Sequence, residues 1–174
     1  MRMCERKCLM ITTLIILVAV CALSLGFILI IPYFASAKAF MSFLPQDIRE
    51  AAKGHPNPSA GKLVFGYLLT AVAACAYLAA LWFLGADGIR RGYGFWLLFG
   101  RYILFLYGYK LFDIVVQDQY IVISRKYYVR FYPETKGCKS WNDRSFNTKK
   151  QTVRLITFPF AAALLAWIML TIGG

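Results

Sequence analysis

Three ionisable side chains lie inside an otherwise apolar run of this chain, Phe95–Val116. They are Arg101, Lys110 and Asp113. A charged group near the centre of a bilayer costs about 2.5–3.5 kcal/mol on insertion scales, so such residues mark binding sites, ion pathways or structural ion pairs. Lys110 and Asp113 are three residues apart, which makes them neighbours on a helix and predicts that they pair.

The polar residues of this run gather on one side of the helix that it predicts. At about 100° per residue, one stripe holds Tyr102, Tyr109, Lys110, Asp113 and Gln117. Arg101 lies on the opposite side, and the apolar runs offer it no visible partner. These residues predict either a structural ion pair together with an Arg101 that extends to the interface, or a polar cavity in the cytoplasmic half that binds a headgroup or an anion. A proton or ion pathway is the third alternative.

A second candidate site is the stretch Arg125–Tyr132, in which cations alternate with aromatic rings. Anionic headgroups attract each nearby Lys or Arg by about 1 kcal/mol, and aromatic rings favour the membrane interface. The same alternation suits single-stranded nucleic acid, but its position between two apolar runs favours lipid. The candidate lipid- or ligand-binding residues are Arg101, Tyr109, Lys110, Asp113, Arg125, Lys126, Arg130 and Trp141.

Residues for acid–base or metal chemistry do not cluster in the sequence. His55 is the single histidine, and no Ser or Cys motif surrounds it. The eight acidic residues show no catalytic spacing, and the five cysteines form no zinc-binding pattern. We therefore expect no cofactor and no metal, and the catalytic residues of any enzyme activity are unknown.

Four long apolar runs must position these residues. A bilayer core of ~30 Å needs about 20 helical residues, and each run is that long. Hydrophobic residues make up 60% of the chain and charged residues only 16%, against about 25% in soluble domains. The sequence predicts an all-α fold, an integral membrane four-helix bundle with interfacial amphipathic segments, in one domain over residues 1–174. Its predicted helices are Cys8–Phe34, Leu63–Gly85, Phe95–Val116 and Val153–Gly174, with a basic, aromatic connection over 117–152.

The first run has a second interpretation, as a cleaved secretory signal. Met1–Lys7 is basic, and Ala35–Ala37 matches a cleavage site. The apolar stretch of about 25 residues is longer than the 7–15 of a signal peptide, so we expect the helix to be retained.

Lys and Arg predict the orientation of these helices. The formal net charge is +12, and most of the cations lie in the first and third connections, Ala35–Lys62 and Gln117–Thr152. Excess Lys and Arg stay in the cytoplasm, which predicts that both long connections are cytoplasmic and both termini outside. The basic N-terminal tail alone favours the opposite orientation.

The first connection contains a short amphipathic segment. Pro45 suits a helix start, Asp47 and Glu50 suit the positive N-terminal end of the helix dipole, and Gly54 suits its end. We expect this helix to lie on the membrane; the alternative is a lid over a site between the helices.

Three short stretches, Phe112–Val116, Phe131–Thr135 and Trp141–Asn147, resemble sequences of small, uncharacterised four-helix membrane proteins of bacteria. The likeness covers a minority of the chain. The resemblance implies a bacterial inner-membrane protein and transfers no activity.

The sequence as a whole predicts a non-enzymatic, lipid- or partner-binding protein that crosses the cell membrane several times. Its expected partners are anionic membrane lipids and either a second copy of the chain or another membrane protein, and no nucleic acid. The first alternative is an enzyme acting on a lipid-linked or phosphorylated substrate at the cytoplasmic interface, with Lys110, Asp113, Arg125 and Arg130 binding its phosphate. The second is an oligomeric transporter or channel.

Overall fold

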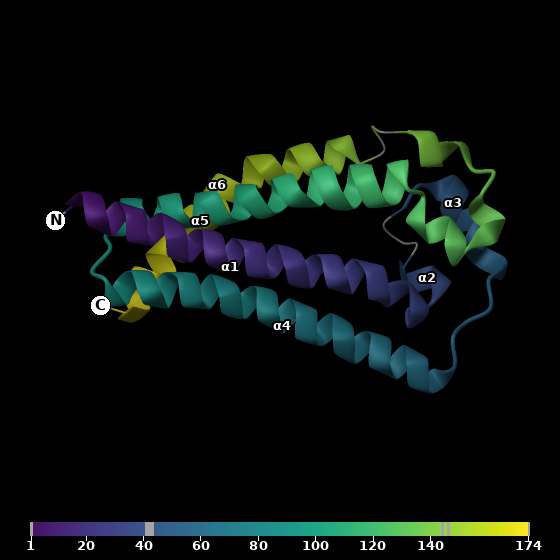
Figure 1. The fold of residues 1–174 in the computed structure, drawn as a ribbon, viewed down its shortest axis with the longest axis horizontal. Coiled ribbons are helices and arrows are strands. Elements are labelled where there is room, and N and C mark those ends of the chain that lie inside the picture. Colours follow the sequence, from purple (N-terminus) through teal and green to yellow (C-terminus); the bar gives the residue numbers. More distant parts are fainter. Residues whose placement is uncertain (1, 41–43, 144, 146, 174) are drawn as a thin grey trace. The chain divides into compact units, whose positions relative to one another are not determined.

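The structure, a computed structural model, describes residues 2–40, 44–143, 145 and 147–173 (Figure 1). Within these ranges the chain forms helices and turns, and no strand. The prediction of an all-α fold is therefore confirmed. The long helices are α1 (Arg2–Ile30), α4 (Ala60–Arg90), α5 (Phe95–Phe112) and α6 (Thr148–Gly173).

Short helical elements fill the connections. A 3-10 turn, η1 (Ile31–Tyr33), follows α1 and precedes α2 (Ala37–Phe40), α3 (Gln46–Ala51) and η3 (Ala52–Gly54). A π-helix, η4 (Asp113–Ser124), continues directly from α5. It is followed by the 3-10 turns η5 (Tyr127–Arg130), η6 (Pro133–Thr135) and η7 (Lys139–Asn142).

Among the described residues, three segments are long and apolar enough to cross a membrane. They are Ile11–Tyr33, Ala60–Arg90 and Gln151–Gly173. They correspond to the first, second and fourth spans predicted from the sequence. The predicted third span, which contains Arg101 and Lys110, is not one of them, so its place in the membrane stays a prediction.

Two helical segments extend beyond their predicted C-terminal ends. Helix α4 continues past Gly85 to Arg90, because Asp87 pairs with Arg91 and with Arg101 and therefore does not stop the helix. The helical segment after Phe95 continues to Ser124, well inside the predicted connection 117–152. Polar residues suggested an end there, but Gln117 is buried and donates a hydrogen bond to Ser24 Oγ at 2.6 Å.

The chain divides into two compact units, and each is described by itself. Unit 1 comprises Met1–Leu23, Ala74–Phe112 and Lys150–Gly174. Its core draws on all the long helices, with Val20 from α1, Leu84 from α4, Phe105 from α5 and Ala166 from α6. Small residues allow close packing here, since a β-carbon on Gly85 would overlap the Tyr102 hydroxyl and the Met169 side chain.

Unit 2 comprises Ser24–Ala73 and Asp113–Lys149. Most of its core belongs to what we call the aromatic head, residues 44–55 and 120–143, where α3 packs against η6 and η7. Ile48, Tyr132 and Trp141 are each about 1% exposed within it. The elements of the head are too short to be stable alone, so these buried contacts hold them.

The predicted helix between Pro45 and Gly54 is confirmed. Pro45 precedes α3, and η3 ends at Gly54. Its apolar residue Ile48 faces the core of the aromatic head.

Candidate functional site

Arg101 is buried in unit 1, with 1% of its surface exposed. Its Nε donates to Thr13 Oγ1 at 2.9 Å, and one amino group donates to the Leu84 carbonyl oxygen at 2.8 Å. The other amino group donates to Asp87 Oδ2 at 2.7 Å and forms an ion pair. The apolar runs of the sequence showed no partner for Arg101, and its ionic partner in the structure, Asp87, lies just beyond the predicted second run. Its partner Asp87 was assigned to a loop, whereas α4 continues through it.

The Asp87 carboxylate bridges two guanidinium groups. Its Oδ1 accepts a hydrogen bond from Arg91 Nε at 2.9 Å, one helical turn further along the chain. The Asp87 side chain is 17% exposed, whereas that of Arg91 is 38% exposed. The cluster thus connects a buried cation to the protein surface. Its contacts commit Arg101 to holding α1, α4 and α5 together in unit 1.

The polar stripe of the sequence falls into two parts. Lys110 is 3% exposed near the end of α5, and Tyr109 packs against Tyr77 with ring centroids 5.3 Å apart; both belong to unit 1. Asp113 begins the π-helix and belongs to unit 2. The rotation of about 100° per residue that placed these residues on one side of a helix thus applies only as far as Phe112. The pairing of Lys110 with Asp113 stays a prediction.

Trp141 lies in the core of the aromatic head rather than on a surface. It is 1% exposed, and its Nε1 donates to the Thr135 carbonyl oxygen at 2.8 Å. Its ring is therefore not available to a ligand at the surface of this structure. The sequence suggested an interfacial ring because a Trp beside cations is compatible with either location.

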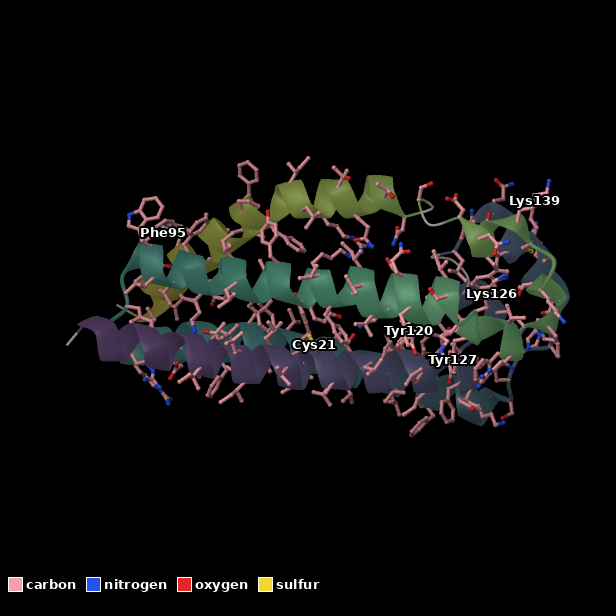
Figure 2. All side chains as sticks on the ribbon, turned by 45° about the horizontal axis from the view of Figure 1, so that its top comes forward. Cys21, Phe95, Tyr120, Lys126, Tyr127 and Lys139 are labelled. Atoms are coloured by element: carbon pink, nitrogen blue, oxygen red, sulfur yellow. The ribbon has the colours of Figure 1, made fainter. Side chains whose placement is uncertain are left out.

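The other basic candidates are at the surface of unit 2. The Arg125 guanidinium lies 5.3 Å from the centre of the Tyr120 ring, and its Nε donates to the Tyr120 hydroxyl at 3.2 Å. The Arg130 guanidinium lies 5.9 Å from the centre of the Tyr127 ring. Both arginines are exposed. Figure 2 labels Tyr120, which lies in η4, and Tyr127, which lies in η5.

Lys126 makes the turn between these elements. Its backbone has φ 47° and ψ 41°, the left-handed conformation that non-glycine residues rarely adopt. Its Nζ donates to Asn142 Oδ1 at 2.9 Å, which ties the turn to η7. Beyond this turn, η5 contacts the end of α1.

Two contacts join η5 to the end of the first candidate span. The Tyr127 hydroxyl donates to the Leu29 carbonyl oxygen at 2.9 Å, and the Phe131 ring meets the Tyr33 ring edge to face with centroids 4.6 Å apart. The sequence did not reveal this link, because a bond to a backbone carbonyl leaves no trace in the residue types. Tyr127 and Phe131 are four residues apart, which is compatible with one face of a helix but does not predict which part of the chain that face contacts.

Asp47 ties the first connection to the third. Its Oδ1 accepts from the Ile48 amide at 2.9 Å and its Oδ2 from the Ser140 amide at 3.1 Å. Burial disfavours the charged form of this carboxylate, but the hydrogen bonds from Ser140 and Ile48 outweigh it and lower the pKa of Asp47. Burial and the nearby Asp47 raise the pKa of the Cys138 thiol, which donates to the Asp47 carbonyl oxygen.

A second link joins the same connections. His55 Nδ1 lies 2.8 Å from Glu134 Oε1, and the His55 ring packs against Tyr132 with centroids 4.7 Å apart. Burial and the Glu134 charge raise the pKa of Tyr132 to about 12, so its hydroxyl stays protonated. None of these contacts was expected from the sequence, since each joins residues far apart in the chain.

Among the described residues, no three His, Cys, Asp or Glu side chains lie close enough to hold a metal ion together. Comparison of the chain with protein-family models, curated proteins and solved structures gives no significant match.

Proposed function

We propose that the chain is a multi-pass protein of the cell membrane, folded as a four-helix bundle, with a non-enzymatic role in binding lipids or a membrane partner. The observation that carries this proposal is the outward exposure of large apolar side chains along the candidate spans. Examples on α1, α4 and α6 are Leu14, Ile15, Val18, Leu68, Val72, Leu78, Ile156, Phe160 and Trp167, each at least 42% exposed.

Such exposure is incompatible with a water-facing surface of this extent. Only 6% of the most apolar window of α4 is buried. Leaving a Leu, Val or Phe side chain in water rather than in an apolar environment costs about 1.5–3 kcal/mol, and soluble monomers rarely expose apolar patches above a few hundred Å². Hydrocarbon chains around the helices would remove this cost.

Helix α5 suits an inner position in such a bundle. It contributes Leu98, Tyr102, Phe105 and Leu106 to the core of unit 1. Its one cation opposite the stripe, Arg101, has a carboxylate and neutral oxygens as partners. A charge that is paired inside the protein avoids most of the cost of facing lipid.

Binding rather than catalysis is supported by where the unusual side chains lie. Arg101 and Trp141 are committed to buried contacts, whereas Arg125 and Arg130 are exposed beside the end of the first span. Exposed guanidinium groups and rings bind headgroups without needing an acid or a base.

Lipidomics of the purified protein tests this role. The full chain is extracted from membranes in a mild detergent, and its bound lipids are compared with those of the whole membrane. We expect enrichment of anionic phospholipids or the recovery of a defined membrane partner. A bound-lipid profile identical to the bulk membrane, with no partner recovered, would contradict the proposal.

A further inference from the structure

We propose that the segment Arg125–Phe131, which we call the basic segment, binds the phosphate groups of anionic phospholipids through Arg125 and Arg130. This inference rests on the proposed membrane location and adds to it a site and a ligand class. The segment contains three cations and no acidic residue.

The first step is the level of the basic segment relative to the bilayer. Tyr127 and Phe131 contact Leu29 and Tyr33, at the end of the candidate span Ile11–Tyr33. The 23 residues of that span extend about 34 Å as a helix, slightly more than a ~30 Å hydrocarbon core. Its end, and the segment bound to it, therefore lies at the depth of the phosphates.

The second step is the orientation of the guanidinium groups. The guanidinium carbons of Arg125 and Arg130 lie 5.3 and 5.9 Å from the centres of the Tyr120 and Tyr127 rings. Because Arg125 Nε donates to the Tyr120 hydroxyl, the donors that this side chain would offer to a phosphate are those of its two terminal amino groups. A guanidinium edge matches two oxygens of a phosphate, which is why Arg suits phosphate recognition better than Lys.

The third step is that the backbone holds this arrangement against a cost. The left-handed conformation of Lys126 is unfavourable for a residue with a β-carbon, and backbone strain of this kind clusters at functional sites. The hydrogen bond from Lys126 to Asn142 helps to maintain the turn. In the orientation expected from the Lys and Arg distribution, the segment faces the cytoplasmic leaflet, where anionic lipids are abundant.

The test is a lipid titration of the purified full chain in detergent micelles, followed by native mass spectrometry. The probes are phosphatidylglycerol and, as the zwitterionic reference, phosphatidylcholine with the same acyl chains. We expect the double variant Arg125→Gln/Arg130→Gln to bind phosphatidylglycerol about 30-fold more weakly, from the loss of two surface attractions. Its binding of phosphatidylcholine, whose phosphate charge is balanced by the choline cation, should fall by much less.

The matched control is Lys136→Gln/Lys139→Gln, which removes the same charge from two exposed residues elsewhere in the aromatic head. Figure 2 shows Lys139 away from Lys126 and Tyr127. We expect this control to bind phosphatidylglycerol like the wild type. Equal losses in both double variants, or no loss in the arginine variant, would overturn the assignment. Circular dichroism checks that both variants keep their helices.

Two further measurements keep the test decisive. If the glutamine variant unfolds, Arg125→Lys/Arg130→Lys keeps the charge and loses the planar edge, and we expect it to bind more weakly than the wild type. Unchanged binding by that variant would refute the guanidinium contact. Excess inorganic phosphate should not displace the lipid, and displacement would mean that free phosphate is the ligand. A wild type that binds neither lipid would overturn this assignment and, if no membrane partner is recovered with it, the proposed function as well.

Discussion

Replacing Asp87 with alanine should destabilise unit 1 more than replacing Arg101 with methionine does. Without Asp87, the partners that the buried Arg101 guanidinium keeps among the described residues are the neutral Thr13 hydroxyl and Leu84 carbonyl. Without Arg101, the Asp87 carboxylate keeps its bond to Arg91 and partial contact with solvent. The two halves of one ion pair therefore differ in what their loss leaves behind.

The magnitudes follow from this asymmetry. Removing one partner of a buried ion pair costs about 3–5 kcal/mol because an uncompensated charge remains, so we expect a loss near 3 kcal/mol for Asp87→Ala. Methionine has a similar length to arginine and no charge, so Arg101→Met should cost about 1 kcal/mol, mainly from the hydrogen bonds lost by Thr13 and Leu84. The double variant should resemble Arg101→Met, which corresponds to a coupling of about 3 kcal/mol.

The assay is reversible unfolding in mixed micelles, with increasing SDS and helicity as the readout for the wild type, both single variants and the double variant. The expected order of stability is wild type first, then Arg101→Met and the double variant together, then Asp87→Ala. Two results would refute the reasoning. One is a smaller loss for Asp87→Ala than for Arg101→Met, and the other is additivity of the single losses in the double variant.

Three further changes test other parts of the fold. Gly66→Ala should lower the stability of unit 2, because the added β-carbon would lie 2.8 Å from the backbone oxygen of Phe34. Gly61→Ala has open space around the added β-carbon and should gain up to about 1 kcal/mol of stability from helix propensity. Equal melting temperatures for the two variants would contradict the close contact at Gly66. Lys126→Gly should be about 1–2 kcal/mol more stable than Lys126→Ala. Both variants lose the ammonium group, but only alanine keeps the strain of a β-carbon in the left-handed conformation. Unfolding in SDS measures the difference, and an alanine variant as stable as the glycine variant would exclude strain at this position. Asp47→Asn should lower the melting temperature at pH 7 but not at pH 2. A carboxylate whose pKa is lowered in the folded state stabilises the fold at pH values above its ordinary pKa near 3.9, and this contribution is lost as the pH falls through the pKa of the folded state. A difference in melting temperature from the wild type that is independent of pH would be inconsistent with an ionised Asp47.

Much of the fold could be predicted from the sequence, because the thickness of a bilayer fixes the length of a spanning helix and an apolar run of that length is visible in the sequence. Three of the predicted spans recur as apolar helices, and the helix between Pro45 and Gly54 was predicted from its terminal residues. The ends of α4 and η4 were not, because the polar residues Asp87 and Gln117 are typical of a helix end unless their buried partners are known. Local patterns do not contain such partners.

The candidate site was predicted in composition but not in arrangement. Arg125 and Arg130 were identified from the alternation of cations and rings, and both are exposed. The same alternation grouped Trp141 with them, although its ring is buried, since residue type alone does not separate an interfacial ring from a core ring. The hydrogen bond from Tyr127 to Leu29 could not be predicted for another reason. Every residue carries a backbone carbonyl oxygen, so the sequence does not indicate which one accepts the bond.

Alkaline extraction of membranes from cells that express the full chain tests the central claim most directly. High pH strips proteins that are held at the surface by charge or by other proteins, whereas helices in contact with hydrocarbon remain. We predict that the chain stays in the membrane pellet and is released only by detergent. Its recovery in the alkaline supernatant would contradict the account, because the exposed apolar faces of α1, α4 and α6 would then have to be covered by something other than lipid.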